Sequence, residues 1–574
     1  MRGKILTILC AIALSLTLLP NTNAAEEPIS PAEAELPEAT QGTQPAAMEP
    51  ETDGNRVLVG LCYGSGTLPG ANLKNSVGEG YRFGYLDKDR AFWEVARIGE
   101  TTISVVKTQN VWYGTPGQYP SYGDEATSDV FVGCWHALVP LEFQSWEEAA
   151  GYAESVGGFP AWIDGAYQVR IGAFATKDEA KALADTFGGT VVGTSGYGVS
   201  VVRTGTAQVL FQFDGKREDL PLTVLPGQIR GEKTVTYFRG VRYYGGFQYR
   251  RFGGGNLTVI NVVNMESYVS CLLSQEMSPS WPIEALKAQA VCARNYVEAD
   301  GRGRHSGFDV CPTTHCQAYP GLGGENERTR QATAETANLR AWYDGKQAHT
   351  YYFSSSGGGS EDVKNVWGSS GYPYLCGVID PYEETVKEQI AYWSTTKTYT
   401  ATELTEVLNS KGYVNAGIVD VKTELSPTGN VKTLILVDAK GKSWPFVKES
   451  GVRNMLGLKS MRYQVERSEQ KSETATGTWY TDGGGTLSSM GDVYVIGTGG
   501  KVEKVSGDVY VISSSGTQAL MESSGQAAEP VFTFHVSGWG HSVGMSQWGA
   551  YAMASQGKTF DEILKFYYPG IELY

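Results

Sequence analysis

An internal repeat restricts the fold of this chain more than any other feature of its sequence. Residues 143–158 and 174–189 align with each other at an offset of 31, and each copy ends in Gly-Gly. Apolar residues recur at helical spacing in both copies, which is typical of an amphipathic helix closed by a glycine. Strand-like runs flank the two helices, at residues 135–141, 161–163, 167–172 and 199–202. Two β-α-β halves of this kind predict one small ferredoxin-like sheet with two helices across residues 134–204.

The composition of the whole chain suits strands and turns. Of its 574 residues, 41% are hydrophobic and 71 are glycine, so two or three globular domains are expected. The predicted fold class is α+β. Seven cysteines lie beyond the first 24 residues, and an odd number cannot complete a disulfide framework.

Residues 1–24 have the pattern of a secretory signal peptide. Arg2 and Lys4 precede an apolar run from Ile5 to Leu19, and small residues follow it. We therefore expect the protein to be exported to the cell wall or extracellular space. An uncleaved segment would instead anchor it in the membrane.

Residues 25–55 are predicted to be an acidic linker rich in Pro and Ala. Eight acidic residues and no Lys or Arg occur between residues 26 and 53, so this segment has no core to form. The formal net charge of the chain is -15, and no basic stripe is present elsewhere. Nucleic acid is therefore not an expected partner.

Glu276 is the strongest candidate for catalysis. It lies on a predicted turn before a helix over residues 283–297, which begins behind Pro282. Met277 and Trp281 would desolvate the carboxyl group and raise its pKa, as a general acid requires, whereas a nearby helix N-terminus would lower it. The sequence leaves open the direction of this shift and also a purely structural role.

Two imidazoles and two thiols gather within twelve residues at His305, Cys311, His315 and Cys316. This set is sufficient to close a tetrahedral Zn²⁺ site, and a closed site is structural. The spacing differs from that of common zinc fingers, so incidental His and Cys residues are the alternative.

Several segments, in order, resemble the SpoIID/LytB family. Ser274–Tyr296 is similar to the family pattern S-x-E-M-P-x-x-W-P-x-E-A-L-K-A-Q-A-V-A-A-R-x-Y, with Pro279 displaced by one position and Cys292 in place of Ala. Tyr351–Trp367 is similar to Y-x-S-x-x-G-G-x-T-x-x-x-x-x-V-W. Gly538–Ala554 is similar to G-x-G-H-G-V-G-M-S-Q-x-G-A-x-x-M-A, with Ser542 at a usual Gly.

This resemblance implies a SpoIID-type catalytic domain interrupted by other segments. Residues 56–133 would form its N-terminal part and residues 206–574 the remainder. A Gly/Ser-rich insertion at 470–530 contains Gly-Asp-Val-Tyr-Val-Ile twice, which predicts a hairpin. Within 134–204, Tyr167–Phe174 is similar to the Y-x-V-Q-I-G-A-F opening of SPOR domains, which bind denuded peptidoglycan glycan. A spacer without a ligand is the alternative.

The function implied by the resemblance is that of an exported peptidoglycan lytic transglycosylase. Such an enzyme cleaves the MurNAc-GlcNAc bond of denuded glycan strands and leaves 1,6-anhydro-MurNAc ends, in sporulation or wall remodelling. Glu276 would act first as acid and then as base. Some family members bind zinc through a matching cluster, and a SpoIIP-like cell-wall amidase is an implied partner. The alternative is a non-catalytic amidase enhancer of the LytB type, while a zinc hydrolase is disfavoured because four protein ligands would close the site.

Further candidates concern the substrate. The resemblance implies substrate-binding roles for Ser355, Ser356, Gly357, Gly358, His541 and Gln547. Lys287 and Arg294 lie seven residues apart on one helix face, where they would meet a lactyl carboxylate or form structural ion pairs. Glu361 and Asp362 are the nearest candidates for the second carboxylate that a hydrolase requires.

Overall fold

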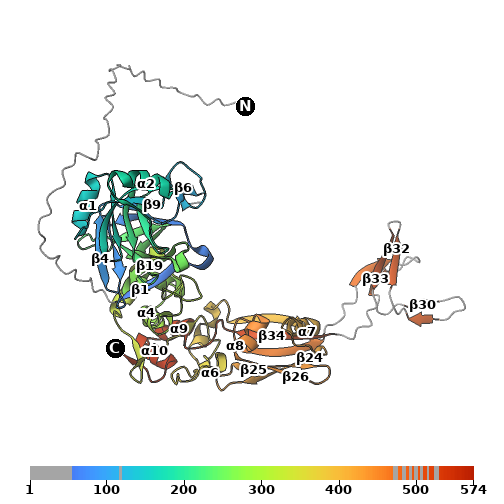
Figure 1. Cartoon of the computed structure of the whole chain (residues 1–574). Helices are drawn as coiled ribbons and strands as arrows, with labels where there is room; N and C mark the ends of the chain where they lie inside the picture. Colours follow the sequence, from blue (N-terminus) through green and yellow to red (C-terminus); the bar gives the residue numbers. More distant parts are fainter. Residues whose placement is uncertain are drawn as a thin grey trace, which may run out of the picture.

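The computed structural model describes residues 55–115, 119–469 and 529–574, together with short strands between residues 476 and 521. The predicted signal peptide and nearly all of the predicted linker lie outside the described residues. Figure 1 shows a body of packed sheets, a helical layer beside it and an elongated arm of strands that extends from the helical layer. The fold is α+β, as the composition and the repeat predicted.

Two sheets pack against each other in the body. The first has six strands in the order β1 (Arg56–Cys62), β19 (Thr258–Asn264), β18 (Gly246–Arg250), β15 (Leu222–Pro226), β3 (Tyr81–Leu86) and β4 (Phe92–Ile98). The second has ten, in the order β12 (Thr190–Val192), β9 (Trp135–Leu138), β11 (Ala166–Phe174), β10 (Phe159–Ile163), β14 (Val209–Asp214), β13 (Val199–Arg203), β5 (Thr102–Lys107), β2 (Gly70–Val77), β16 (Val235–Phe238) and β17 (Val241–Tyr244). Phe83 and Phe211, one from each sheet, meet with ring centroids 5.4 Å apart in the common core.

The repeat folds as β9-α1-β10-β11-α2-β12, with α1 at Trp146–Ser155 and α2 at Lys177–Thr186. Ser145 and Thr176 cap the two helices through their hydroxyl groups, which explains where each helix begins. Both helices lie on one face of the sheet (Figure 1), over an apolar cluster that includes Val169 and Ile171. The predicted pair of β-α-β halves is therefore present.

The last strand of the repeat is not where the sequence predicted it. The fourth strand is β12, whereas residues 199–202 belong to β13, which pairs with β5 and β14. In addition, β10 pairs in parallel with β14, so the repeat is continuous with the ten-stranded sheet. This pairing covers an edge that would otherwise leave unpaired backbone groups.

A flap made of β6 (Val111–Thr115), β7 (Ser121–Gly123) and β8 (Phe131–Val132) covers part of the other face of this sheet. Val111, Tyr122 and Val132 from the flap pack with Phe159 and Val202 from the sheet. The flap therefore occupies the middle of the face that lies opposite α1 and α2.

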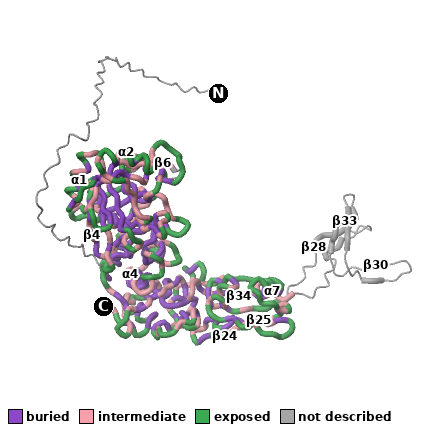
Figure 2. Tube along the Cα trace, in the orientation of Figure 1, coloured by how far each residue is buried: buried purple, intermediate pink, exposed green. Residues whose placement is uncertain are grey.

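The helical layer surrounds one central helix. It contains α3 (Met265–Glu276), α4 (Ile283–Asn295), α5 (Glu327–Glu335), α9 (Gln547–Ser555) and α10 (Phe560–Tyr567), and α4 contacts the other four. Ala285, Ala288, Ala290 and Ala293 of α4 are completely buried. Small side chains suit this position because neighbouring helices approach α4 from several sides; Figure 2 shows how little of it is exposed.

The arm consists of two three-stranded sheets and two helices. One sheet has the order β23 (Ser394–Thr400), β34 (Pro530–Ser537) and β27 (Tyr463–Glu469), and the other has the order β24 (Ile418–Leu425), β25 (Val431–Asp438) and β26 (Ser443–Val447). Helices α7 (Ala401–Ser410) and α8 (Lys448–Val452) pack on these strands. Strand β34 leads the chain back to the helical layer.

The predicted hairpin in the 470–530 insertion is wrong in its pairing. The repeated segments contribute β30 (Tyr494–Ile496) and β32 (Val509–Ser513), which pair with the strands that follow them, β31 (Val502–Lys504) and β33 (Gly516–Met521), and not with each other. A further pair is β28 (Thr476–Tyr480) with β29 (Thr486–Ser489). The rest of the insertion lies outside the described residues.

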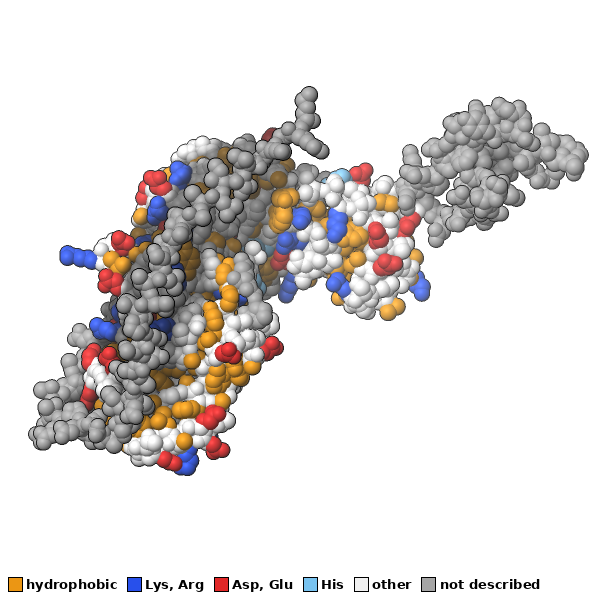
Figure 3. All heavy atoms as spheres, turned by 90° about the horizontal axis from the view of Figure 1, so that it is seen from above, with side chains coloured by type: hydrophobic (Ala, Val, Ile, Leu, Met, Phe, Trp, Pro, Cys, Tyr) orange, Lys and Arg blue, Asp and Glu red, His pale blue; other side chains and the backbone are white. Residues whose placement is uncertain are grey.

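Acidic and basic side chains are interspersed on the face seen in Figure 3. All seven cysteines in the described residues are free thiols. Within the same residues, no helix has the length and apolar character needed to cross a membrane.

Candidate active site

A cleft of about 430 Å³ brings together segments from the whole second half of the chain. It lies where the end of α3, the His/Cys segment, β22 (Tyr352–Phe353), the β34–β35 connection and the start of α9 meet. Strand β22 pairs in parallel with β35 (Met545–Ser546), which joins the second and third family-like segments. The lining residues are Glu276, Tyr296, Arg304, Thr314, His315, Cys316, Tyr351, Tyr352, Phe353, Ser354, Trp367, Trp539, Gly540, His541 and Gln547.

Glu276 is the last residue of α3 and not part of the predicted turn. Burial raises the pKa of its carboxyl group above the usual value, although hydrogen bonds from Ala318, Tyr352 and Gln547 act in the opposite direction. The backbone N–H of Ala318 and Nε2 of Gln547 each donate to a different carboxylate oxygen at 3.4 Å. The C-terminal end of a helix also disfavours a negative charge. Glu276 therefore has the raised pKa that a proton donor needs.

A buried chain of side chains supports the Tyr352 hydroxyl beside this carboxyl group. Tyr268 donates to Oε1 of Gln317 at 3.0 Å, and Nε2 of Gln317 donates to the Tyr352 oxygen at 3.1 Å. Tyr268 and Gln317 are completely buried. The sequence interpretation missed Tyr352, although it lies in the recognised Tyr351–Trp367 segment.

Glu276 is the only carboxylate among the described residues that line the cleft. The two predicted candidates for a second carboxylate are engaged elsewhere. Glu361 is buried and accepts hydrogen bonds from Ser426 and Thr428, while Asp362 caps the short helix α6 (Val363–Val366). Neither of them lines the cleft.

Two residues predicted to bind substrate, His541 and Gln547, do line the cleft. Burial lowers the pKa of His541 to about 4, so its imidazole is neutral at pH 7. The backbone N–H of Val543 donates to Nδ1 of His541 at 3.1 Å, which assigns the ring proton to Nε2. His541 can therefore donate one hydrogen bond from Nε2 but does not serve as a cation.

The Ser355–Gly358 segment, also predicted to bind substrate, lies outside the residues that line the cleft. Ser355 and Ser356 are buried, and Ser356 donates both its backbone N–H and its hydroxyl to the carboxylate of Glu383. Gly357 has a φ of 62°, and a Cβ atom there would lie 2.6 Å from the Ser537 carbonyl carbon. The glycines therefore serve close packing under the cleft.

Ser542 adopts a φ of 67° and is completely buried. A residue at this backbone conformation is normally glycine, which is the residue that the family pattern has here. Within the described residues the Ser542 hydroxyl has no hydrogen-bond partner.

Lys287 and Arg294 form structural ion pairs outside the cleft. Lys287 pairs with Glu284 at 2.8 Å and with Glu335 at 2.5 Å. The Arg294 side chain has no exposed surface, and its guanidinium binds both carboxylate oxygens of Glu266. The Arg294 side chain therefore lies where a substrate could not contact it. For both Lys287 and Arg294, the structure agrees with the predicted alternative of structural ion pairs.

Arg304 is the only Lys or Arg among the described residues that line the cleft. Its guanidinium donates to the hydroxyl of Tyr296, and its side chain is otherwise exposed at the cleft wall. Aromatic side chains accompany it, including Trp367 and Trp539. The sequence interpretation assigned no site role to Arg304, Trp367 or Trp539, because the segments that carry them meet only in the folded chain.

The four predicted metal ligands lie together at one end of the cleft. One ligand atom from each of His305, Cys311, His315 and Cys316 can be chosen so that all four lie within 4.8 Å of one another. His305 Nε2 lies 3.2 Å from Cys316 Sγ, and Cys316 Sγ lies 3.5 Å from His315 Nδ1. Ligand atoms on the corners of a tetrahedral zinc site are about 3.6 Å apart, given bonds of about 2.2 Å. These residues therefore could hold a metal ion.

Comparison with known proteins bears directly on this site. Residues 253–343 match the family model described as SpoIID, stage II sporulation protein. The chain is also 32% identical over 339 residues to an uncharacterized protein of Brachyspira hyodysenteriae, and the match covers 58% of this chain and 73% of that protein. The chain belongs to the SpoIID family.

Two further proteins that the chain is similar to come from Bacillus subtilis. The stage II sporulation protein D is 26% identical over 334 residues, which cover 55% of this chain and 76% of that protein. The amidase enhancer is 27% identical over 304 residues, which cover 53% of this chain but only 39% of that protein. This chain therefore spans less than half of the amidase enhancer.

The SpoIID match includes the central groups of the cleft. Glu276 and all four residues of the His/Cys cluster fall within residues 253–343. By contrast, His541 and Gln547 reach the cleft from outside that range. The site is thus assembled from the family segment and from the C-terminal end of the chain.

Proposed function

We propose that this SpoIID-family chain is an exported peptidoglycan lytic transglycosylase that cleaves the MurNAc-GlcNAc bond of denuded glycan strands. The observation that carries the proposal is Glu276, a carboxyl group with a raised pKa and the only carboxylate among the described cleft residues. A single carboxyl group of this kind suits a reaction that needs one proton donor and in which the substrate itself supplies the nucleophile.

The chemistry follows from this single carboxyl group. Glu276 protonates the glycosidic oxygen as the bond from MurNAc C1 breaks, and the GlcNAc part leaves with that proton. The carboxylate then takes the proton from the C6 hydroxyl of MurNAc, whose oxygen bonds to C1 and closes a 1,6-anhydro ring. Hydrolytic glycosidases usually use a second carboxylate for water or a covalent intermediate. The C6 hydroxyl of MurNAc makes a second carboxylate unnecessary, because this nucleophile belongs to the same sugar and is already positioned for attack.

The position of Arg304 on the cleft wall supports the proposed preference of the enzyme for denuded strands. Removing the stem peptide frees the lactyl carboxylate of MurNAc, and a guanidinium binds a carboxylate through paired hydrogen bonds. Carboxylate binding was one of two roles that the sequence left open for Lys287 and Arg294, and we assign it instead to Arg304 because this residue is the cation among the described residues that line the cleft.

The His/Cys cluster is proposed to hold a structural Zn²⁺. His305, Cys311, His315 and Cys316 would supply all four ligands, and their spacing in the structure supports this assignment. Bound zinc would cross-link the segment that carries Arg304 and part of the cleft wall. The proton transfers are assigned to Glu276.

The repeat module is proposed to add glycan affinity in the manner of a SPOR domain. Its strand order, β12-β9-β11-β10 with both helices on one face, supports the likeness. The flap covers part of the opposite face, and a pocket of about 300 Å³ remains beside it, lined by Gln168, Arg170 and Lys216 among others. Arg170 is itself buried and bonded to Gln168 and Gln212, so the open part of this face is small.

Incubation of the purified chain with denuded and with peptide-bearing glycan, followed by mass analysis of the products, tests the proposal. Anhydro products from the denuded strands and few from the peptide-bearing strands are expected. Arg304→Gln should reduce this preference, whereas Arg302→Gln, an exposed neighbour, should not. Cleavage of both substrates at equal rates by the unmodified chain would contradict the role of Arg304.

Enhancement of a partner amidase is the second candidate, because one relative is named an amidase enhancer. It predicts no glycan product from this chain alone and faster peptide release by an added cell-wall amidase. Glu276→Gln would leave that stimulation unchanged, which separates the two functions.

A further inference from the structure

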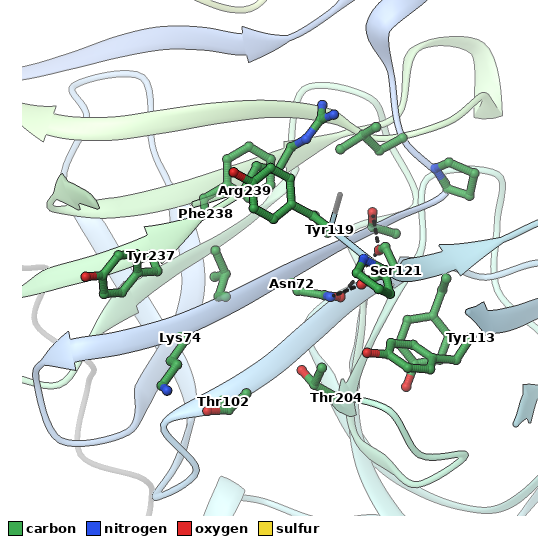
Figure 4. A pocket seen from close by; sticks show the side chains of 17 residues that line it. Asn72, Lys74, Thr102, Tyr113, Tyr119, Ser121, Thr204, Tyr237, Phe238 and Arg239 are labelled. Carbon is green, nitrogen blue, oxygen red and sulfur yellow. Dashed lines mark hydrogen bonds between the residues drawn. The ribbon is translucent and has the colours of Figure 1, made fainter. Parts of the chain in front are cut away.

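A cavity beside the flap lies away from the candidate active site and is lined by different kinds of side chain. It has a volume of about 520 Å³ and is formed by β2, β5, the flap and the β16–β17 turn (Figure 4). It shares no lining residue with the cleft around Glu276. We propose that this cavity binds an acidic wall glycan, with sugar rings against its tyrosines and separate anionic groups of the polymer on Lys74 and on Arg239. That the glycan is peptidoglycan rests on the proposed function.

The cavity opens on the face of the ten-stranded sheet that the flap partly covers. Asn72 and Lys74 alternate along β2 with Ala71 and Leu73, whose side chains are buried in the main core. Tyr237 pairs with Lys74 across the strands and so belongs to the same face. In the view of Figure 4, Tyr237 and Tyr113 lie at opposite ends of the cavity with Asn72 and Lys74 between them.

The tyrosines are unusually exposed for large side chains. Tyr119 is 41% exposed and Tyr237 is 37% exposed, while Tyr113 is half-buried. A tyrosine ring has an electron-rich face that packs well on polarised C–H groups and an edge hydroxyl that hydrogen-bonds. Sugars present both kinds of group, so three tyrosines along one cavity suit a carbohydrate chain better than a purely apolar ligand.

The charged side chains that line the cavity are basic, whereas the chain as a whole is acidic. Lys74 and Arg239 line it, and none of its described lining residues is Asp or Glu, although the chain carries a formal charge of -15. Neither cation has a carboxylate partner in the part of the chain that the structure describes; the Arg239 guanidinium contacts only the Cys62 thiol at 3.8 Å. Two cations facing one cavity without acidic partners favour an anionic ligand.

The walls of the cavity are held in place without a ligand. Nδ2 of Asn72 donates to the Pro120 carbonyl at 2.7 Å, and its Oδ1 accepts from Ser104 and Ser121 at 2.7 and 3.3 Å. These bonds fix the flap to β2, as Figure 4 shows for Asn72 and Ser121. A preformed site loses less conformational entropy on binding.

The turn that carries Arg239 is shaped around Tyr119. Arg239 has a φ of 48° and Gly240 a φ of 79°. A Cβ atom on Gly240 would lie 2.2 Å from the Tyr119 hydroxyl oxygen, so only glycine lets the ring approach the turn. This contact places the exposed Tyr119 ring beside the turn that carries Arg239.

The test uses the full chain carrying Glu276→Gln, so that bound glycan is not cleaved. Calorimetry would measure its affinity for denuded glycan strands, for the same strands with their carboxyl groups reduced to alcohols, and for a glycerol-phosphate polymer. A Lys74→Gln, Arg239→Asn variant removes both charges, and Asn tolerates the left-handed turn. Tyr237→Ser removes one ring, and Lys346→Gln is the matched control at an exposed lysine outside the cavity.

We expect at least tenfold weaker binding of denuded strands by the double variant and by Tyr237→Ser, with the control unchanged and the melting temperatures equal. A similar loss on reducing the carboxyl groups would identify the lactyl carboxylate as the anion. A loss seen only with the phosphate polymer, which has no sugar rings, would overturn the glycan assignment. Unchanged affinity of both variants for all three polymers would overturn the proposal. Cleavage of short soluble glycan by the chain without Glu276→Gln tests the proposed function separately.

Discussion

Gln547 donates a hydrogen bond from Nε2 to Oε2 of Glu276 at 3.4 Å, although the two residues are 271 positions apart. Gln547 is the first residue of α9, and Glu276 is the last of α3. The bond joins the family segment to the C-terminal end of the chain at the group that would transfer protons. A donor in this position stabilises the carboxylate and so lowers its pKa.

Gln547→Leu should therefore raise the pKa of Glu276 further. Because the acid form would persist to higher pH, the alkaline limb of kcat/KM should move upward, by less than about one pH unit for a single long hydrogen bond. The measurement is a pH profile on denuded glycan, with Gln556→Leu at the exposed end of α9 as the control. A limb that stays fixed or moves to lower pH would contradict this role of Gln547.

Arg294→Met should destabilise the fold by about 3–5 kcal/mol, because it leaves the Glu266 carboxylate without its buried partner. Denaturant unfolding measures this change. Lys287→Met should cost about 1 kcal/mol or less, since its ion pairs are closer to solvent. Adding Glu266→Gln to Arg294→Met should restore part of the loss. A stable Arg294→Met protein with a raised KM would instead indicate contact with substrate.

Chelation, or Cys311→Ser, should lower the melting temperature, because metal binding by a closed site is coupled to folding. Activity should fall only as structure is lost. Cys376→Ser is the matched control, since this free cysteine is exposed and lies outside the cluster. Carefully purified protein without zinc, or equal melting temperatures for both variants, would count against the metal site.

Glu383 should make the folded state less stable as pH rises from about 4.5 to 7. Burial, with a contribution from the nearby Asp380 carboxylate, raises the pKa of Glu383 from 4.5 to about 7. The folded state therefore binds more protons than the unfolded state across this window, and the free energy of unfolding falls with pH by an amount on the order of 3 kcal/mol. Glu383→Gln should flatten the dependence. An equally steep dependence in that variant, measured by denaturant unfolding, would exclude Glu383 as its source.

The features that could be predicted from sequence are those determined by neighbouring residues. Glu276 and the His/Cys cluster could be recognised as candidates because each pattern occupies a few neighbouring positions. The two helices of the repeat could be predicted because local caps and glycines determine where they begin and end. The partners of Glu276 could not be predicted in this way. Tyr352, for example, is brought to Glu276 by the pairing of distant segments, namely the parallel contact of β22 with β35.

Packing decides between roles that composition and helical spacing leave open. Ser355–Gly358 has the polar, glycine-rich composition of a sugar-binding loop, yet its glycines allow close backbone contact and Ser356 donates two hydrogen bonds to the buried Glu383. Arg294 lies on a helix that has buried neighbours on several sides, so its charge is neutralised inside the protein. Helical spacing alone does not distinguish a solvent face from such a buried face.

Digestion of denuded glycan in heavy-oxygen water tests the central claim most directly. If Glu276 is acid and then base to an intramolecular hydroxyl, mass analysis should show 1,6-anhydro-MurNAc ends without label, and the folded Glu276→Gln protein should form none. Reducing MurNAc ends that carry the heavy isotope would show that water is the nucleophile, and the single-carboxylate account would then be wrong.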